Sequence, residues 1–313
     1  MTPELETPEA IAQRLNQRGG AFEAHELSGV LRSMARKGLV KAGRCQTGLG
    51  YALMPFVVGI YEAQVGRIDA RLAGLFERYY QQAFGQMLAV EPAYHRVIPV
   101  GESVRTDLEI RPYESAAEIV NGAQAWGVLD CICRKQKALI GQACEHPLDV
   151  CMALAPIAGV FDHHAVIRPL THDEALNTLQ RAAAAGLVHS VSNSQDGLSY
   201  ICNCCTCSCG ILRGVAELGI AGAVARSAFV NQVDLDLCLA CQTCLGYCQF
   251  GALTLDDGCV VVIQARCVGC GVCIPSCPEE ALHLIRRPEG EAPAPPLNEA
   301  DWRSQRLAFQ QNH

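Results

Sequence analysis

Apolar residues in the first 60 positions recur at the spacings of two helices followed by a strand pair. Thr7 and Pro8 are typical of a helix start, and Gly19 marks the end of the helix predicted over residues 7–17. A second helix is predicted over residues 25–37, because the apolar positions 27, 30, 31 and 34 share one face. Residues 38–40 then begin a strand, glycines at 48 and 50 make a turn, and residues 51–53 return.

This order of helix, helix and hairpin resembles a winged helix. A basic face would suit a DNA-reading regulator, and its residues would be Arg32, Arg36, Lys37, Lys41 and Arg44. Winged helices also serve as interaction modules. We favour that second interpretation, because nothing else in the chain is directed at an operator.

Residues 60–90 carry the pattern of one longer amphipathic helix. Its apolar stripe is predicted to face a core or a second subunit, and consists of Ile68, Leu72, Leu75, Phe76, Tyr79, Ala83 and Met87. The outward face is predicted to hold Arg71, Glu77, Arg78, Gln81 and Gln82.

The middle of the chain contains a weak internal repeat, in which residues 113–130 align with residues 172–189. Each copy begins with a helix cap, Ser115 with Glu118 or Thr171 with Glu174. Each helix is predicted to stop at a glycine, at position 127 or 186, and to enter a strand that leads to cysteines. The second copy first passes through a hairpin predicted at residues 193–197. Few residues are identical between the copies, so a chance resemblance stays open.

Composition narrows the class of protein. The chain has 313 residues, half of them apolar, and 19 cysteines, with a net charge of −7. The acidic first ten residues lack an apolar signal core, so the cysteines predict metal ligation in a reducing cytoplasm and not disulfides. No stretch approaches the ~20 apolar residues of a membrane span. The negative charge argues against nonspecific nucleic-acid binding by the whole chain.

Two cysteine runs near the C-terminus carry the strongest chemical signal. Each has the spacing Cys-x₂-Cys-x₂-Cys-x₃-Cys, and proline follows the second run. In bacterial runs of this spacing, three cysteines hold one 4Fe–4S cluster and the fourth ligates the other cluster. We therefore expect two 4Fe–4S clusters, one on Cys238, Cys241, Cys244 and Cys277 and the other on Cys267, Cys270, Cys273 and Cys248. Zinc knuckles need fewer thiolates than this segment supplies.

On these runs, residues 233–284 resemble the bacterial two-cluster ferredoxin domain. One position departs from that family, which usually has proline where this chain has Gln249. The departure puts the tuning of the neighbouring cluster in doubt, but not its ligation. The segment is also acidic, which either steers it toward a basic redox partner or simply forms a solvated surface.

Nine further cysteines lie upstream of the ferredoxin runs. Their density predicts metal binding by Cys131, Cys133, Cys144, Cys151, Cys202, Cys204, Cys205, Cys207 and Cys209. One plausible site takes Cys133, Cys144 and Cys151 from the first repeat half and some of Cys202, Cys204 and Cys205 from the second. The nine thiols could also serve two clusters, or one cluster and a zinc. Adjacent Cys204 and Cys205 point apart on an extended backbone, so they share a site only if the chain bends. The basic residues 134, 135 and 137 would either offset cluster charge or form a solvated loop.

Over residues 5–285, the chain resembles a poorly described group of bacterial iron–sulfur proteins. The resemblance rests on Cys131-Ile-Cys133-Arg134, on Cys202-Asn-Cys204-Cys205 and on the ferredoxin runs. It implies electron transfer to or from a redox protein partner, as a component of a larger oxidoreductase system without a catalytic residue of its own. The alternative is an iron–sulfur redox sensor whose winged helix binds DNA.

The predicted fold class is α+β, in five segments: 1–60, winged-helix-like; 61–112, amphipathic helix and connector; 113–225, cysteine-rich repeat; 226–286, two-cluster ferredoxin; and 287–313, linker and terminal helix. Trp302 and Phe309 of the terminal helix either dock on a neighbour or belong to a disordered tail. Cys259 and Cys45 are interpreted as structural thiols, and metal binding by His163 and His164 as the less favoured alternative.

Overall fold

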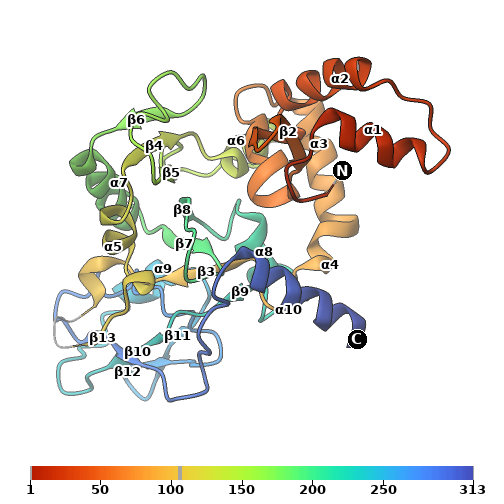
Figure 1. The fold of residues 1–313 in the computed structure, drawn as a ribbon. Coiled ribbons are helices and arrows are strands. Elements are labelled where there is room, and N and C mark those ends of the chain that lie inside the picture. The colour runs from red at the N-terminus through yellow and green to blue at the C-terminus, as the bar shows by residue number, and fades with distance from the viewer. Residues whose placement is uncertain (1, 105–107, 313) are drawn as a thin grey trace. The chain divides into compact units, whose positions relative to one another are not determined.

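The computed structural model describes residues 2–104 and 108–312. The chain forms two compact units, Met1–Asp69 and Ala70–His313. Helices and strands are mixed in both units, as an α+β protein requires (Figure 1). The predicted cysteine-rich and ferredoxin segments both belong to the second unit. Among the described residues, no helix is long and apolar enough to cross a bilayer.

The first unit follows the predicted order of elements. Helix α1 spans Pro8–Asn16 and is capped by Thr7, whose hydroxyl accepts a hydrogen bond from the amide of Ala10 at 3.4 Å. Helix α2 spans Ala24–Arg36, and strands β1 (Val40–Cys45) and β2 (Gly48–Leu53) pair antiparallel. The core of this unit consists of Ile11, Leu31, Val40 and Tyr51. Short turns at Phe56–Ile60 and Glu62–Gln64 follow the hairpin.

The second unit opens with a helical run made of α3 (Ala70–Tyr79), a wider turn over Tyr80–Phe84 and α4 (Gly85–Met87). This run begins ten residues later than the predicted start at residue 60. The predicted outward position of Glu77 is wrong, because its carboxylate lies 2.6 Å from the buried Arg213 guanidinium and 3.5 Å from Lys137 Nζ. Leu75 and Tyr79, assigned to the apolar stripe, are instead exposed. Polar partners on α6 (Ile132–Leu139) and α8 (Gly210–Ala216) thus hold Glu77 inward, which hydropathy alone does not predict.

A seven-stranded sheet forms the centre of the second unit, in the order β6-β4-β5-β8-β7-β3-β9 (Figure 1). All neighbouring strands pair antiparallel except β3 and β9. The strands span Arg168–Leu170 (β6), Ala125–Leu129 (β4), Cys151–Ala155 (β5), Tyr200–Cys204 (β8), Val188–Ser192 (β7), His95–Ile98 (β3) and Val224–Ala225 (β9). The predicted hairpin at residues 193–197 is confirmed, because it joins β7 to β8.

Helices α5 (Ala116–Asn121) and α7 (His172–Ala184) pack with the sheet around a shared apolar core. Their predicted caps at Ser115 and Thr171 are confirmed, and Gly186 follows α7 with φ +74°, as a helix-ending glycine should. The matching prediction for Gly127 is wrong. Helix α5 ends at Asn121, and Gly127 lies inside β4, where a Cβ would overlap the side chain of Ile167. The glycine serves close packing and not helix termination.

The ferredoxin segment forms two small antiparallel sheets and one short helix. Strand β10 (Phe229–Val233) pairs with β13 (Leu282–Arg286), and β11 (Leu253–Asp256) pairs with β12 (Cys259–Val262). Helix α9 (Thr243–Tyr247) lies within the first cysteine run. Because β10 and β13 come from the two ends of the segment, their pairing brings both cysteine runs into one compact region.

The chain ends in helix α10 (Glu299–Asn312), which packs on its own unit. Trp302 Nε1 donates to the carbonyl of Ala93 at 2.8 Å, and the Trp302 ring lies 5.4 Å from that of Tyr94. Arg306 is buried over the same tyrosine ring and donates to the carbonyls of Met87, Val90 and Pro92. The predicted docking of Trp302 therefore takes place within the chain.

Candidate metal centres

The two ferredoxin runs fold into loops with the same backbone conformation. Residues two and four positions after the first cysteine of each run have left-handed φ angles: Ala240 and Gln242 in one loop, Gly269 and Gly271 in the other. The residue three positions after the last cysteine is left-handed in both runs as well, at Gly251 and Glu280. Alternation of left- and right-handed residues turns successive backbone amides into a concavity, the arrangement that binds anions and iron–sulfur clusters.

Thiols of the two runs group across the sequence. The thiol charges that raise the pKa of Cys244 come from Cys277, Cys241 and Cys238, and those that raise the pKa of Cys273 come mainly from Cys270, Cys248 and Cys267. Each group thus takes three cysteines from one run and the fourth from the other. This is the grouping that crossed ligation would require.

The second loop is much more enclosed than the first. Cys267 and Cys273 are buried, whereas Cys241 is exposed. Burial raises the pKa of the Cys270 thiol to about 12, so the thiolate form needs a nearby positive charge, which a bound metal would supply. Two N–H groups already point at sulfur in this part of the site: Asn231 Nδ2 donates to Cys273 Sγ at 3.3 Å, and the Ala252 amide donates to Cys248 Sγ at 3.2 Å. Such hydrogen bonds to cluster sulfurs tune reduction potential.

Six of the nine upstream cysteines form a closed ring near the end of β4, the start of β5 and the end of β8. Cys131 makes thiol contacts with Cys133 and Cys151, Cys133 with Cys209, and Cys204 with both Cys202 and Cys209. The charge of Cys202 in turn acts on Cys151, which closes the ring. Its members are Cys131, Cys133, Cys151, Cys202, Cys204 and Cys209. Three come from each half of the predicted repeat; three of the six are buried and the other three are partly buried.

Positive charge surrounds this ring. Cys131 is the N-cap of α6 (Ile132–Leu139) and Cys209 the N-cap of α8 (Gly210–Ala216), so both helices turn their N-terminal amides toward the thiols. Arg134, the first basic residue predicted to offset cluster charge, is buried and donates to the carbonyls of Pro147 and Asn203. Burial would lower the pKa of Arg134, but the neighbouring Cys131 and Cys205 raise it. Lys137 instead lies beside Glu77.

The remaining three upstream cysteines gather around a histidine that sequence reasoning missed. The ligand atoms of Cys144, His146, Cys205 and Cys207 all lie within 4.8 Å of one another. In a tetrahedral zinc site with Zn–S bonds of ~2.3 Å, the ligand atoms lie about 3.8 Å apart, so these four atoms need to approach one another by no more than about 1 Å. A cubane, by contrast, holds its ligands on separate irons. The four residues therefore fit a single tetrahedral ion of the Cys₃His type.

The short Cys144-x-His146 spacing is the signal that could have identified this histidine. His163 and His164, which were considered instead, are exposed, and His164 Nδ1 accepts hydrogen bonds from the amides of Val166 and Ile167. Cys144 and Cys205 thus lie apart from Cys133 and Cys151, with which they were grouped in the single-site prediction. Adjacent Cys204 and Cys205 join different groups, as side chains that alternate on extended chain should.

Gln249, the position that departs from the ferredoxin family, connects the two regions. Its side-chain carbonyl accepts a hydrogen bond from the amide of Thr206 at 2.8 Å, and its side-chain amide donates to the carbonyl of Gly186. Thr206 lies between Cys205 and Cys207, and Gln249 directly follows Cys248. A proline could make neither hydrogen bond. These two bonds therefore explain why glutamine occupies this position, which the sequence alone did not reveal.

Two cysteines lie in hairpin strands outside these groups. Cys259 begins β12 and Cys45 ends β1, both partly exposed. Cys45 Sγ lies 3.3 Å from the carbonyl of Gly48 within the same hairpin. Their interpretation as structural thiols stays a prediction.

Comparison with known proteins bears on the second of the two ferredoxin loops. Residues 260–283 match the 4Fe-4S binding domain family. The match contains Cys267, Cys270, Cys273 and Cys277. It covers a small part of the chain and supports at least one 4Fe–4S cluster there.

Curated relatives point in the same direction. The chain is 38% identical over 61 residues to the electron transport protein HydN of Escherichia coli strain K12, and equally similar to HydN of strains O6:H1 and O157:H7. The aligned part is 19% of this chain and 35% of each relative, so the chain spans about a third of the length of these relatives. No solved structure matches the chain significantly. Together with the thiol geometry, these similarities support an iron–sulfur electron-transfer role.

Proposed function

We propose that this protein relays electrons between redox protein partners through two ferredoxin-type 4Fe–4S clusters and a further cluster in the upstream ring. The observation that carries this function is the grouping of the ferredoxin thiols, in which each run surrounds the fourth cysteine of the other. That arrangement places two clusters close together, and short separation is what a relay requires. The DNA-binding alternative receives no support from the comparisons.

Electrons enter or leave at the first ferredoxin loop. Cys241 is exposed, and Leu239, between the cysteines of this loop, is 70% exposed. Leu235 and Leu237 add exposed apolar surface, and Asp234 and Asp236 add negative charge. An apolar patch with an acidic border suits brief docking of a partner with a basic surface. The second loop is buried and would pass electrons inward.

The six-thiol ring holds the further iron–sulfur cluster, and the Cys₃His group holds zinc. Both sites take half of their ligands from each half of the repeat, so metal binding fastens β5 to β8. A structural zinc needs a closed set of four ligands, which Cys144, His146, Cys205 and Cys207 supply. The cluster needs four of the six ring thiols, and Arg134 balances part of its negative charge.

Metal analysis of the anaerobically purified full chain tests this function. About twelve irons, twelve acid-labile sulfides and one zinc are expected per chain, from three cubanes and one Cys₃His site. Changing Cys248 or Cys277 to Ala should each disturb the cluster held by the opposite run. Cys259→Ala is the matched control and should keep all the iron. About four irons in the unchanged protein would contradict the relay.

Three further variants separate the two upstream assignments. Cys133→Ala should remove iron and its EPR signal but keep zinc, whereas His146→Ala should release zinc and keep iron. Cys204→Ala should give the same loss as Cys133→Ala if one cluster joins the repeat halves. If all three variants lose zinc alone, the upstream region is a structural clasp and contains no third redox centre.

A further inference from the structure

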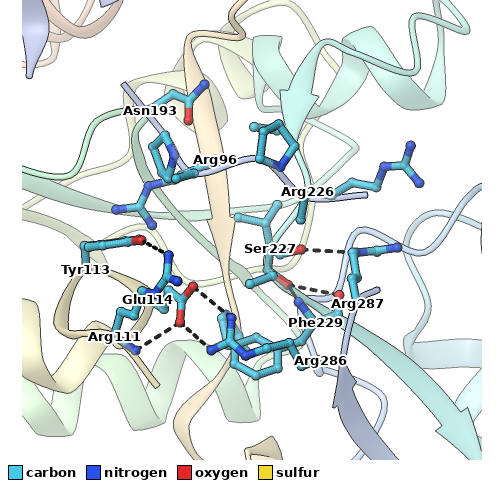
Figure 2. Close-up of a pocket in the computed structure, with 18 of the residues that line it drawn as sticks. Arg96, Arg111, Tyr113, Glu114, Asn193, Arg226, Ser227, Phe229, Arg286 and Arg287 are labelled. Atoms are coloured by element: carbon cyan, nitrogen blue, oxygen red, sulfur yellow. Dashed lines mark hydrogen bonds and ion pairs between the residues drawn. The ribbon is translucent and has the colours of Figure 1, made fainter. Parts of the chain in front are cut away.

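A cavity of about 490 Å³ opens beside the second ferredoxin loop. Figure 2 shows Tyr113, Glu114 and Arg111 at one side of this cavity and Ser227 and Arg287 at the other, with Arg96 above them. The segment from Pro288 to Pro295 forms a further border. This segment is fixed at its far end, because Gln195 Nε2 donates to the carbonyl of Pro295 and the Gln195 amide to that of Pro296.

Positive charge dominates the lining. Five arginines face two carboxylates, which leaves three positive charges in excess. Glu114 is already occupied: it lies 2.8 Å from Arg286 and accepts the amide of Arg111 at 3.0 Å. Glu289 is exposed on the proline-rich border. The arginines are Arg96, Arg111, Arg226, Arg286 and Arg287.

Two of these arginines are buried without a salt-bridge partner among the described residues. Arg96 is 5% exposed; one of its terminal nitrogens donates to the carbonyl of Ser194 at 3.1 Å, while its Nε has no hydrogen-bond partner. Arg287 is equally buried and donates only to the carbonyls of Ser227 and Cys267, at 3.1 and 2.6 Å. Within residues 2–104 and 108–312, neither guanidinium has a carboxylate partner. Carbonyls satisfy N–H groups but do not neutralise charge, and an unpaired buried charge is costly.

The cavity wall is also the outer surface of the second cluster loop. The Arg287 guanidinium donates a hydrogen bond to the carbonyl of Cys267, and the Ser227 hydroxyl donates one to the carbonyl of Gly269 at 2.7 Å. Burial lowers the pKa of Arg287, and the charge of Cys267 raises it. An anion in the cavity and the cluster would therefore act on the same guanidinium.

We propose that this cavity binds a small organic or inorganic anion with at least two negatively charged oxygens, of the carboxylate or phosphate type, and that occupancy is coupled to the redox state of the adjacent cluster. The planar guanidinium fork matches the paired oxygens of either group. The volume lies in the range of small-molecule sites. Coupling follows because reduction adds negative charge near Arg287, which weakens anion binding, and by reciprocity the bound anion lowers the cluster potential.

Calorimetric titration of the anaerobic full-length protein tests the binding step. The probes are succinate for the carboxylate class, pyrophosphate for the phosphate class, and succinamide as an uncharged analogue of succinate. At least one of the two anions should bind, succinamide should not, and the preference between the anions identifies the class. Binding should weaken at least tenfold in Arg96→Gln and in Arg226→Gln, the second of which alters only an exposed rim position.

Arg168→Gln is the matched control, because Arg168 is an exposed arginine of β6 outside the cavity. Any of three results would overturn the proposal: succinamide binds as well as succinate, neither anion binds at millimolar concentration, or Arg226→Gln leaves the affinity unchanged. Tenfold weaker binding to the reduced protein corresponds to a 59 mV lower one-electron potential in the presence of saturating anion. The shift in potential rests on the proposed cluster at Cys267, whereas the binding experiments do not. Measuring the iron content therefore shows whether a missing shift reflects a missing cluster or a missing coupling.

Discussion

Replacing Gln249 by Ala removes the direct tie between the ferredoxin runs and the upstream cysteines. The change deletes the acceptor for the Thr206 amide and the donor to the Gly186 carbonyl. A hydrogen bond of this kind contributes about 1 kcal/mol net, and Thr206 is partly exposed, so water can replace some of the loss. The two bonds together should stabilise the contact by about 2 kcal/mol, which is a factor of ~30 in local opening.

Hydrogen–deuterium exchange on the anaerobic holoprotein measures this opening. Peptides that contain Thr206 should exchange roughly thirty times faster in Gln249→Ala than in the unchanged protein. Zinc release from Cys205 and Cys207 to a chelator should accelerate in parallel. Gln249→Glu is the matched control: it keeps an acceptor for the Thr206 amide and loses only the donor to Gly186, so it should fall between the two. Unchanged exchange at Thr206 in Gln249→Ala would refute the reasoning.

Three further changes test packing and charge in the second unit. Burial favours protonation of Glu77, but hydrogen bonds and charge from Arg213 lower its pKa to about 2; Glu77→Gln should therefore cost about 3 kcal/mol in urea unfolding. The carboxylate is ionised in both the folded and the unfolded chain above its unfolded pKa of ~4.5. The loss of unfolding free energy in Glu77→Gln should therefore be constant from pH 8 to 6 and disappear only as the pH falls toward 2. Gly271→Ala should release iron from the second loop, since its φ is +71° and a Cβ would overlap Ser103, whereas Gly246→Ala, with open space around it, should not. Gly127→Ala should lower the melting temperature, because overpacking in a core typically costs about 1–3 kcal/mol; an unchanged melting temperature would argue against close packing on Ile167.

Local signals predicted local structure well. Thr171 and Glu174 form the reciprocal cap predicted at the start of α7, and Gly186 supplies the left-handed residue after its end. Errors arose where a partner distant in sequence decides the outcome. Glu77 has the neighbours of an exposed helical residue, and only the folded chain brings Arg213, 136 residues away, against it. Gly127 carries the signature of a helix end, but the side chain it accommodates comes from position 167.

The same distinction applies to the metal centres. Spacing alone was enough to propose ligands for the two ferredoxin clusters, because three cysteines of each run lie within one short loop. The upstream cysteines could be recognised by density but not divided, since their division depends on which strand ends meet. His146 shows the limit most clearly. It lies two residues after Cys144, yet its Nδ1 also lies 3.8 Å from the thiol of Cys207, which is 61 positions away.

The division of the upstream cysteines has a consequence for how the second unit folds. Strands β5 and β8 share only two paired positions, Met152 with Ile201 and Ala153 with Tyr200, although they join the two halves of the seven-stranded sheet. Each proposed metal site takes ligands from both sides of this junction. In an unfolded chain the ligands are dispersed, so the free energy of metal binding becomes free energy of folding. If both proposed sites are filled, metal–thiolate bonds would cross-link this junction of the sheet, where few backbone hydrogen bonds do so.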